Sequence, residues 1–241
     1  MSILDRAARG AMCILFAATL AGFSWSNGEA EQRKSFIAFL QDINNRPGIH
    51  FLVPTDNDEK AIGPYLQQYA IILDFDKDMK VPMDNFVAQA IKLGFGPNPV
   101  PRTIEQMAAA PADLTAAKDA VDKMEQVIET RLAKVTADRA ALKQPDDLKA
   151  VYDKTFDKLV VAPTLAFENS AKTLSNGIDG ALALVAYINA HRTKLVVSGT
   201  QIQAKDQRTL DELQPLMKAY LEAGERFVAA QQQSDRVLRG N

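Results

Sequence analysis

Residues 114–142, LTAAKDAVDKMEQVIETRLAKVTADRAAL, decide the fold of this chain. Apolar side chains recur in them every seven residues, while charged and small residues occupy most other positions. Such a repeat lays one apolar stripe along a helix, and another helix has to cover that stripe. The stretch predicts a helix of about 45 Å in a bundle or antiparallel coiled coil. The repeat consists of Leu114, Val121, Ile128, Val135 and Leu142.

The repeat suits pairing within one chain and pairing between two copies equally well. A homo-oligomer through the helix 114–142 is therefore one expected partnership, and the choice between the two arrangements stays open at this point. The five repeat residues have the same apolar character, so none of them favours either arrangement.

The composition places the chain among mostly helical proteins. Of its 241 residues, 47% are apolar and only 7% are aromatic, and Ala, Leu, Gln, Lys, Asp and Glu are abundant. These proportions favour packed helices over a sheet sandwich. The formal net charge of −2 gives no general attraction to polyanions, so nucleic acid is not an expected partner.

Local patterns predict several more helices around the long one. Apolar residues at helical spacing mark a helix from Glu31, and Thr55 to Asp58 and Thr103 to Gln106 resemble capping boxes that begin others. Further apolar stripes predict helices over 84–92, 148–159 and 164–192. Gly177 and Gly180 in the last of these would permit close approach by a neighbouring helix.

Glycine and proline mark the expected interruptions. Residues 94–102, GFGPNPVPR, form the best internal break. A separate helix is expected to begin after Pro82, and Pro215 predicts a restart or kink. The segment 194–203 departs from helical spacing and predicts a small β-hairpin around Ser198 and Gly199.

The last helix carries more apolar residues than one narrow stripe needs, and residues 231–241 are expected to fray beyond it. These apolar and small residues are Leu210, Leu213, Met217, Tyr220, Leu221, Gly224, Phe227 and Val228. The expected fold is all-α, a bundle of long antiparallel helices with one hairpin. Residues 31–241 form a single domain with a candidate break at 94–102.

Residues 1–30 have the order of an export leader. Arg6 and Arg9 precede an apolar run from Ala11 to Phe23, and polar residues follow. The run is shorter than the roughly 20 residues that cross a bilayer as a helix. A leader removed at export is favoured, and a retained N-terminal membrane anchor is the alternative. The expected location is the periplasm, or the inner membrane facing the periplasm.

The end of the apolar run bears on lipid anchoring. Leu20, Ala21 and Gly22 fit the box that precedes the acylated cysteine of bacterial lipoproteins, but Phe23 occupies the cysteine position. A phenyl ring offers no nucleophile to accept a lipid. Cys13 is the only cysteine and lies early in the run, so a mature product would lack disulfides and thiol chemistry.

Several segments carry a family resemblance. EQRKSFIAFLQ (31–41), GPYLQQYAIIL (63–73), ALKQPDDLKAVYDKTFDKLVVAP (141–163) and VVSGTQIQ (196–203) resemble the YiaF-like envelope lipoproteins, a bacterial family of unknown function. The resemblance implies a cell-envelope protein, anchored by lipid in related members, and brings no reaction with it. Phe23 departs from the pattern on which that anchor depends.

The sequence offers no catalytic, cofactor or metal site. Asp74, Asp76 and Asp78 have calcium-loop spacing but lack the glycine and the final glutamate of such a loop. Asp146 and Asp147 follow Pro145 and suit a helix start. The two histidines, His50 and His191, have no metal-ligand spacing, and neither a nucleophile elbow nor a phosphate loop is present.

Three functional hypotheses remain. The first is a non-enzymatic helical protein that binds another envelope component. The second is a module that holds a lipid or other small apolar ligand between helices. The third and weakest is a hydrolase, which would need His50 or His191 to lie beside a carboxylate in a cleft. The sequence assigns no residue to a ligand or partner surface.

Overall fold

The computed structural model describes residues 27–92 and 102–240, and nearly all of them are helical. In chain order the elements are α1 (Asn27–Asn45), α2 (Asp56–Ile62), η2 (Gly63–Tyr65), α3 (Leu66–Lys92), α4 (Ile104–Ala109), α5 (Pro111–Ala140), α6 (Asp146–Phe156), η3 (Asp157–Val161), α7 (Ala162–Ala190), β1 (Leu195–Ser198), β2 (Gln201–Ala204) and α8 (Gln207–Arg239). The expected all-α class with one small hairpin is confirmed.

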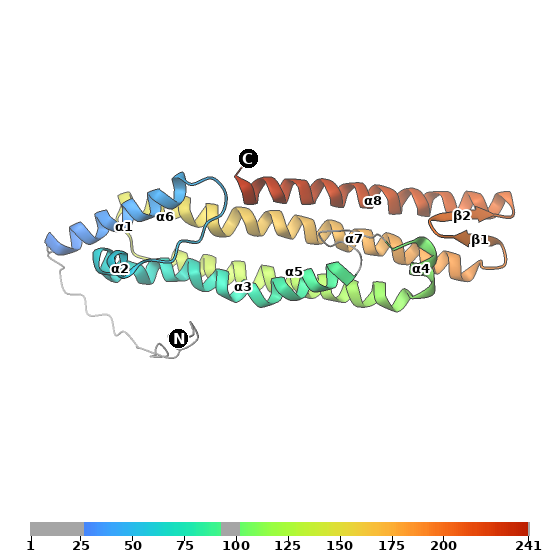
Figure 1. Ribbon diagram of the computed structural model, residues 1–241, viewed down its shortest axis with the longest axis horizontal. Helices are drawn as coiled ribbons and strands as arrows, with labels where there is room; N and C mark the ends of the chain where they lie inside the picture. Colours follow the sequence, from blue (N-terminus) through green and yellow to red (C-terminus); the bar gives the residue numbers. More distant parts are fainter. Residues whose placement is uncertain (1–26, 93–101, 241) are drawn as a thin grey trace.

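The helices form an elongated bundle (Figure 1). Helices α1, α2 and α6 gather at one end, and α4 and the hairpin lie at the other. Helix α7 runs between them, with α8 along one side and α5 and α3 on the other. No helix in the described ranges is long and apolar enough to cross a membrane.

The seven-residue repeat forms the inner face of α5. Leu114, Val121, Ile128 and Val135 are all buried, and α5 packs between α3 and α7. The stripe is therefore covered by helices of the same chain, which answers the question that the sequence leaves open for these four side chains. Leu142 lies just beyond the helix and is half-buried.

Two buried clusters divide the core along the bundle. The first, around Phe36, Tyr69 and Tyr152, fills the end formed by α1, α3 and α6. The second, around Leu174 and Leu184, joins α7 to α4, α8 and the hairpin. Helix α5 contributes side chains to both clusters, so the two ends share one continuous element. The single-domain prediction is not tested by this division, and nearly all of its candidate break lies outside the described residues.

Both predicted capping boxes are present. At α2 the Thr55 hydroxyl accepts from the Asp58 N–H at 3.3 Å, and the Asp58 carboxylate accepts from the Thr55 N–H at 2.8 Å. At α4 the Thr103 hydroxyl and the Gln106 side chain make the same reciprocal pair. Each box satisfies donors that the first helical turn leaves open.

Two predicted helix restarts and one predicted frayed end are wrong. Helix α3 continues through Pro82 because apolar side chains on both sides of it, Met79 and Met83, pack on the first cluster. Helix α8 also runs through Pro215, so it does not restart there, and the kink expected as the alternative stays a prediction. The helix does not fray after residue 230 either, since Leu238 accepts a hydrogen bond from the Ile49 N–H at 3.0 Å.

The helices predicted over 148–159 and 164–192 are one rod. The five-residue π-helical turn η3 joins α6 to α7 without a break. Its Lys158 extends to the C-terminal end of α1, where the ammonium donates to the carbonyls of Ile43 (2.9 Å) and Asn44 (3.3 Å). Burial lowers the pKa of this lysine. The turn thus fixes the end of α1 as well as joining two helices.

The hairpin follows the predicted position closely. Leu195 pairs with Ala204 and Ser198 with Gln201 in an antiparallel register. Gly199, in the two-residue turn, has a φ of 59°, which a residue without Cβ adopts at little cost.

The outer face of α8 as a candidate functional site

Helix α8 packs mainly along α7 and the hairpin. Its buried face includes Leu213, Ala223, Phe227 and Ala230. Gly180 of α7 makes the contact close, because a Cβ there would lie 3.5 Å from the Tyr220 Cα. The predicted close approach is confirmed at Gly180, whereas nothing lies within 4 Å of the corresponding position on Gly177.

A second apolar stripe runs along α8 beside the buried face. Leu221 and Val228 each follow a residue that faces α7, and one position turns a helix by about 100°. Their exposed fractions are 57% and 52%. The spacing of seven, four, three and four residues keeps the whole stripe on one line. It consists of Leu210, Met217, Leu221, Gly224 and Val228, of which the first two are half-buried and the last three are exposed.

The stripe borders a groove of about 400 Å³ between α8 and the hairpin. Ile202 of β2 lines one side, and α8 residues from Leu210 to Glu225 line the rest. The lining residues are Ile202, Leu210, Leu213, Gln214, Met217, Lys218, Leu221, Glu222 and Glu225.

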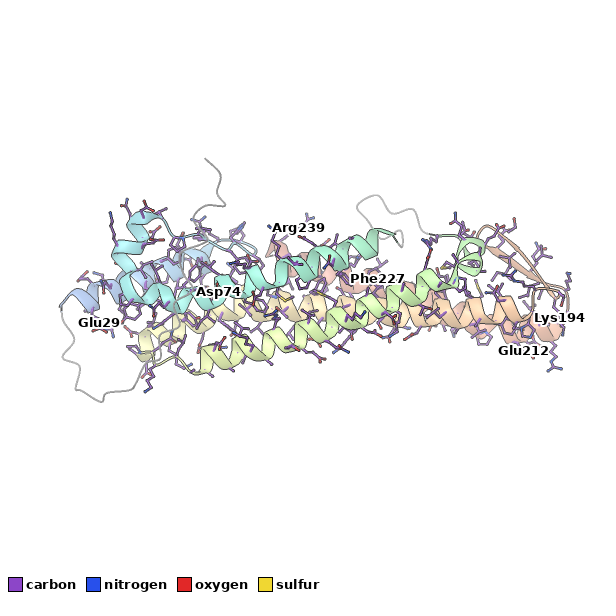
Figure 2. The ribbon with its side chains drawn as sticks, turned by 90° about the horizontal axis from the view of Figure 1, so that it is seen from below. Glu29, Asp74, Lys194, Glu212, Phe227 and Arg239 are labelled. Atoms are coloured by element: carbon purple, nitrogen blue, oxygen red, sulfur yellow. The ribbon has the colours of Figure 1, made fainter. Side chains whose placement is uncertain are left out.

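Both ends of α8 are fixed to the rest of the chain. At the start, the Tyr187 hydroxyl of α7 donates to the Thr209 carbonyl at 3.2 Å. The Asp206 carboxylate caps the helix by accepting from the Thr209 N–H at 2.8 Å, and this hydrogen bond holds the Asp206 pKa below its ordinary value. At the other end, Gly48 lies against the last turn with a φ of 73°, and a Cβ there would lie 2.8 Å from the Leu238 carbonyl oxygen. Figure 2 shows Phe227 and Arg239 along the length of this helix, with Glu212 near its start. The exposed stripe is thus held on a fixed element.

A cluster of polar and charged side chains lies between α5 and α7. The Lys118 ammonium lies 2.8 Å from Asp122 and 3.7 Å from Asp179, and the Ser175 hydroxyl donates to Asp122 at 3.1 Å. The hydrogen bond from Lys118 lowers the pKa of Asp122, whereas burial raises the pKa of Glu125. Lys118 and Asp122 of α5 thus form ion pairs or hydrogen bonds with each other and with Ser175 and Asp179 of α7. These contacts indicate a structural link between the two helices.

The two histidines lie far apart in the chain and in different surroundings. His50 is exposed on the loop after α1. The His191 ring stacks on Tyr187 with 4.1 Å between centroids, and its Nδ1 lies 3.0 Å from the Tyr187 carbonyl oxygen. Neither residue lines a described cavity. This placement gives the hydrolase hypothesis no support.

The acidic residues singled out in the sequence have helical positions. Asp74, Asp76 and Asp78 are exposed on α3, where Asp78 accepts from Arg131 at 2.8 Å. Asp146 and Asp147 lie in the first turn of α6, as predicted, but neither caps it by a hydrogen bond. Within the described ranges, no three His, Cys, Asp or Glu side chains are placed to hold a metal.

These features define a class, an elongated all-α bundle whose last helix carries an exposed apolar face. The chain belongs to the family described as protein of unknown function (DUF3053), which it matches over residues 11–235. The resemblance to YiaF-like proteins is thereby confirmed.

Two curated relatives illustrate the likeness. The uncharacterized protein YiaF of Escherichia coli strain K12 is 26% identical over 181 residues, which cover 74% of this chain and 75% of YiaF. The uncharacterized protein YiaF of Shigella flexneri is similar to the same extent. No solved structure matches the chain.

The sequence contains a signal for the α8 face that is not decisive by itself. The apolar and small residues named for the last helix spread over two adjacent helical stripes between Leu210 and Val228. A wide stripe is also what a helix buried between two neighbours would show. Only the packing of α8 against α7 separates the covered stripe from the exposed one.

Proposed function

We propose that this protein is an exported, non-enzymatic interaction protein of the bacterial cell envelope. It binds another envelope component through the outer face of α8. The observation that carries the proposal is the exposed stripe that includes Leu221 and Val228, on a helix fixed at both ends. Contiguous apolar surface of this kind is typical of interaction sites.

The leader-like residues 1–30 support export, with the periplasm or the periplasmic side of the inner membrane as the location. Phe23 gives lipid anchoring no chemical basis at the expected position. An oligomer through 114–142 is not carried forward, because the repeat residues of α5 are covered by α3 and α7.

The test is site-specific photocrosslinking in cells. A photoreactive residue at Leu221 should give discrete crosslinked bands from the envelope fraction. The matched control is the same residue at Arg226, an exposed position about 140° further round α8. Equal yields from both positions, or no reproducible band from Leu221, would refute the proposal.

The groove beside Ile202 favours a second function, the binding of a lipid or small apolar ligand. Its volume of about 400 Å³ falls within the range of small-molecule sites. Native mass spectrometry of protein purified from envelopes should then show a bound lipid, which Met217→Glu would release. An unliganded mass for both proteins would exclude this function.

A further inference from the structure

The outer face of α8 has a length that suits pairing with another long helix. Its 33 residues span about 50 Å. From Met217 onward the stripe residues are spaced four, three and four apart, which is the spacing of the seam in a two-helix coiled coil. Leu210 lies one seven-residue repeat before Met217. The polar residues Gln214 and Gln231 occupy the remaining seam positions.

The stripe is complementary to itself in one antiparallel register. In this register a second α8 runs antiparallel beside the first, and the two-fold axis passes between residues 222 and 223 of both copies. Met217 of one copy then meets Val228 of the other. In the same register Leu221 meets Gly224. Leu221 is large and 57% exposed, while no atom lies within 4 Å of the place where a Gly224 Cβ would be. A projecting side chain thus faces open space, and the two-fold symmetry repeats the contact.

The charges beside the seam agree with the same register. Lys218 and Glu225 flank the stripe on the side away from α7, and both are exposed. The antiparallel register brings Lys218 of each copy beside Glu225 of the other, so two opposite-charge pairs form. A parallel pair would instead place Lys218 and Glu225 beside Leu213 and Tyr220 of the second copy, so it would form neither charge pair.

We propose that the occupant of this face is a second copy of the chain, and that two α8 helices pair antiparallel through Leu210, Met217, Leu221, Gly224 and Val228. The inference rests on the proposed function only in taking this face as a docking surface. It differs in naming the partner, and it leaves the stripe of α5 inside each copy.

Charge exchange in the full chain tests the register. Sedimentation equilibrium should show a dimer, and Lys218→Glu or Glu225→Lys should each raise its dissociation constant roughly threefold to thirtyfold, because two exposed pairs turn repulsive. The double variant K218E/E225K restores both pairs and should return within about threefold of the original. Arg226→Glu, a charge reversal away from the seam, is the matched control and should leave the constant unchanged.

Disulfide trapping tests the orientation independently. In a chain with Cys13→Ser, a mixture of Leu221→Cys and Gly224→Cys proteins should crosslink faster than either protein alone. Only the antiparallel register places these two positions opposite each other.

Three results would overturn the inference. A wild-type chain that stays monomeric at about 100 µM has no such dimer, because a stable interface would be populated there. A dimer that resists both Leu221→Asp and the charge reversals uses another surface. A double variant no stronger than the single ones rejects the register. If photocrosslinks from Leu221 then contain a different protein, the proposed function stands without the dimer.

Discussion

Two buried tyrosines allow a matched test of what holds the first cluster together. Tyr152 and Tyr69 are both 0% exposed, and both rings pack on aromatic neighbours. The Tyr152 hydroxyl donates to the Gln68 carbonyl at 2.7 Å. The Tyr69 hydroxyl is buried without a hydrogen-bond partner. Burial raises the pKa of Tyr69 to about 12, and the nearby backbone of Leu52 offsets part of this rise.

Removing the two hydroxyls should therefore have different effects. Tyr152→Phe loses a satisfied hydrogen bond and should lower the free energy of unfolding by about 1–2 kcal/mol. Tyr69→Phe removes a polar group that burial penalises, so the expected change lies between zero and a gain of about 1 kcal/mol. For a chain of this size, 1 kcal/mol corresponds to about 2–4 °C in Tm.

Urea unfolding followed by far-ultraviolet circular dichroism measures both variants against the same baseline. The rings remain in each case, so stacking and volume are controlled. Equal losses, or a larger loss for Tyr69→Phe, would refute the reasoning that the Gln68 contact distinguishes these residues.

Three further changes test other parts of the fold. Ile128→Ala, in the buried stripe of α5, should cost about 2–5 kcal/mol in a urea titration, and a loss below 1 kcal/mol would contradict the packing of that stripe. Gly48→Ala should lower Tm because φ is 73° and the Leu238 carbonyl blocks the Cβ, whereas Gly177→Ala should leave Tm unchanged or raise it; the reverse order would be inconsistent with this contact. The Asp206 pKa lies below its ordinary 3.8, so its carboxylate stabilises the fold above that pH, and the contribution disappears as pH falls through the lowered pKa. Asp206→Asn keeps an N-cap acceptor and should flatten the acid limb of Tm against pH, and an unchanged limb would argue against this role.

The local features of this sequence predict local structure well. The seven-residue repeat of α5 and the capping boxes at Thr55 and Thr103 specify their elements because the interactions lie within a few residues. The break predicted at Pro82 is wrong because the prediction weighs only the missing N–H of proline and the clash of its ring with the preceding turn. Packing of Met79 and Met83 on distant helices outweighs that cost and keeps α3 continuous.

The α8 face shows the complementary difficulty. Leu221 and Phe227 are equally apolar in the sequence, yet one is exposed and the other is buried against α7. That difference depends on which neighbour approaches and from which side, and the neighbour is separated along the chain by a hairpin and two turns. Periodicity identifies candidate faces, and tertiary packing selects the one that remains open.

The π-helical turn η3 sets the rotational phase between the two ends of the molecule. Helix α6 contributes to the first cluster and α7 to the second, and η3 determines the angle at which their buried faces follow one another. Deleting one residue from 157–161 would restore α-helical geometry but turn one rod segment by about 100° against the other. Either α6 would then present the wrong face to α1, or α7 would present the wrong face to α5. The length of this connection is therefore as much a part of the packing as the buried side chains on either side of it.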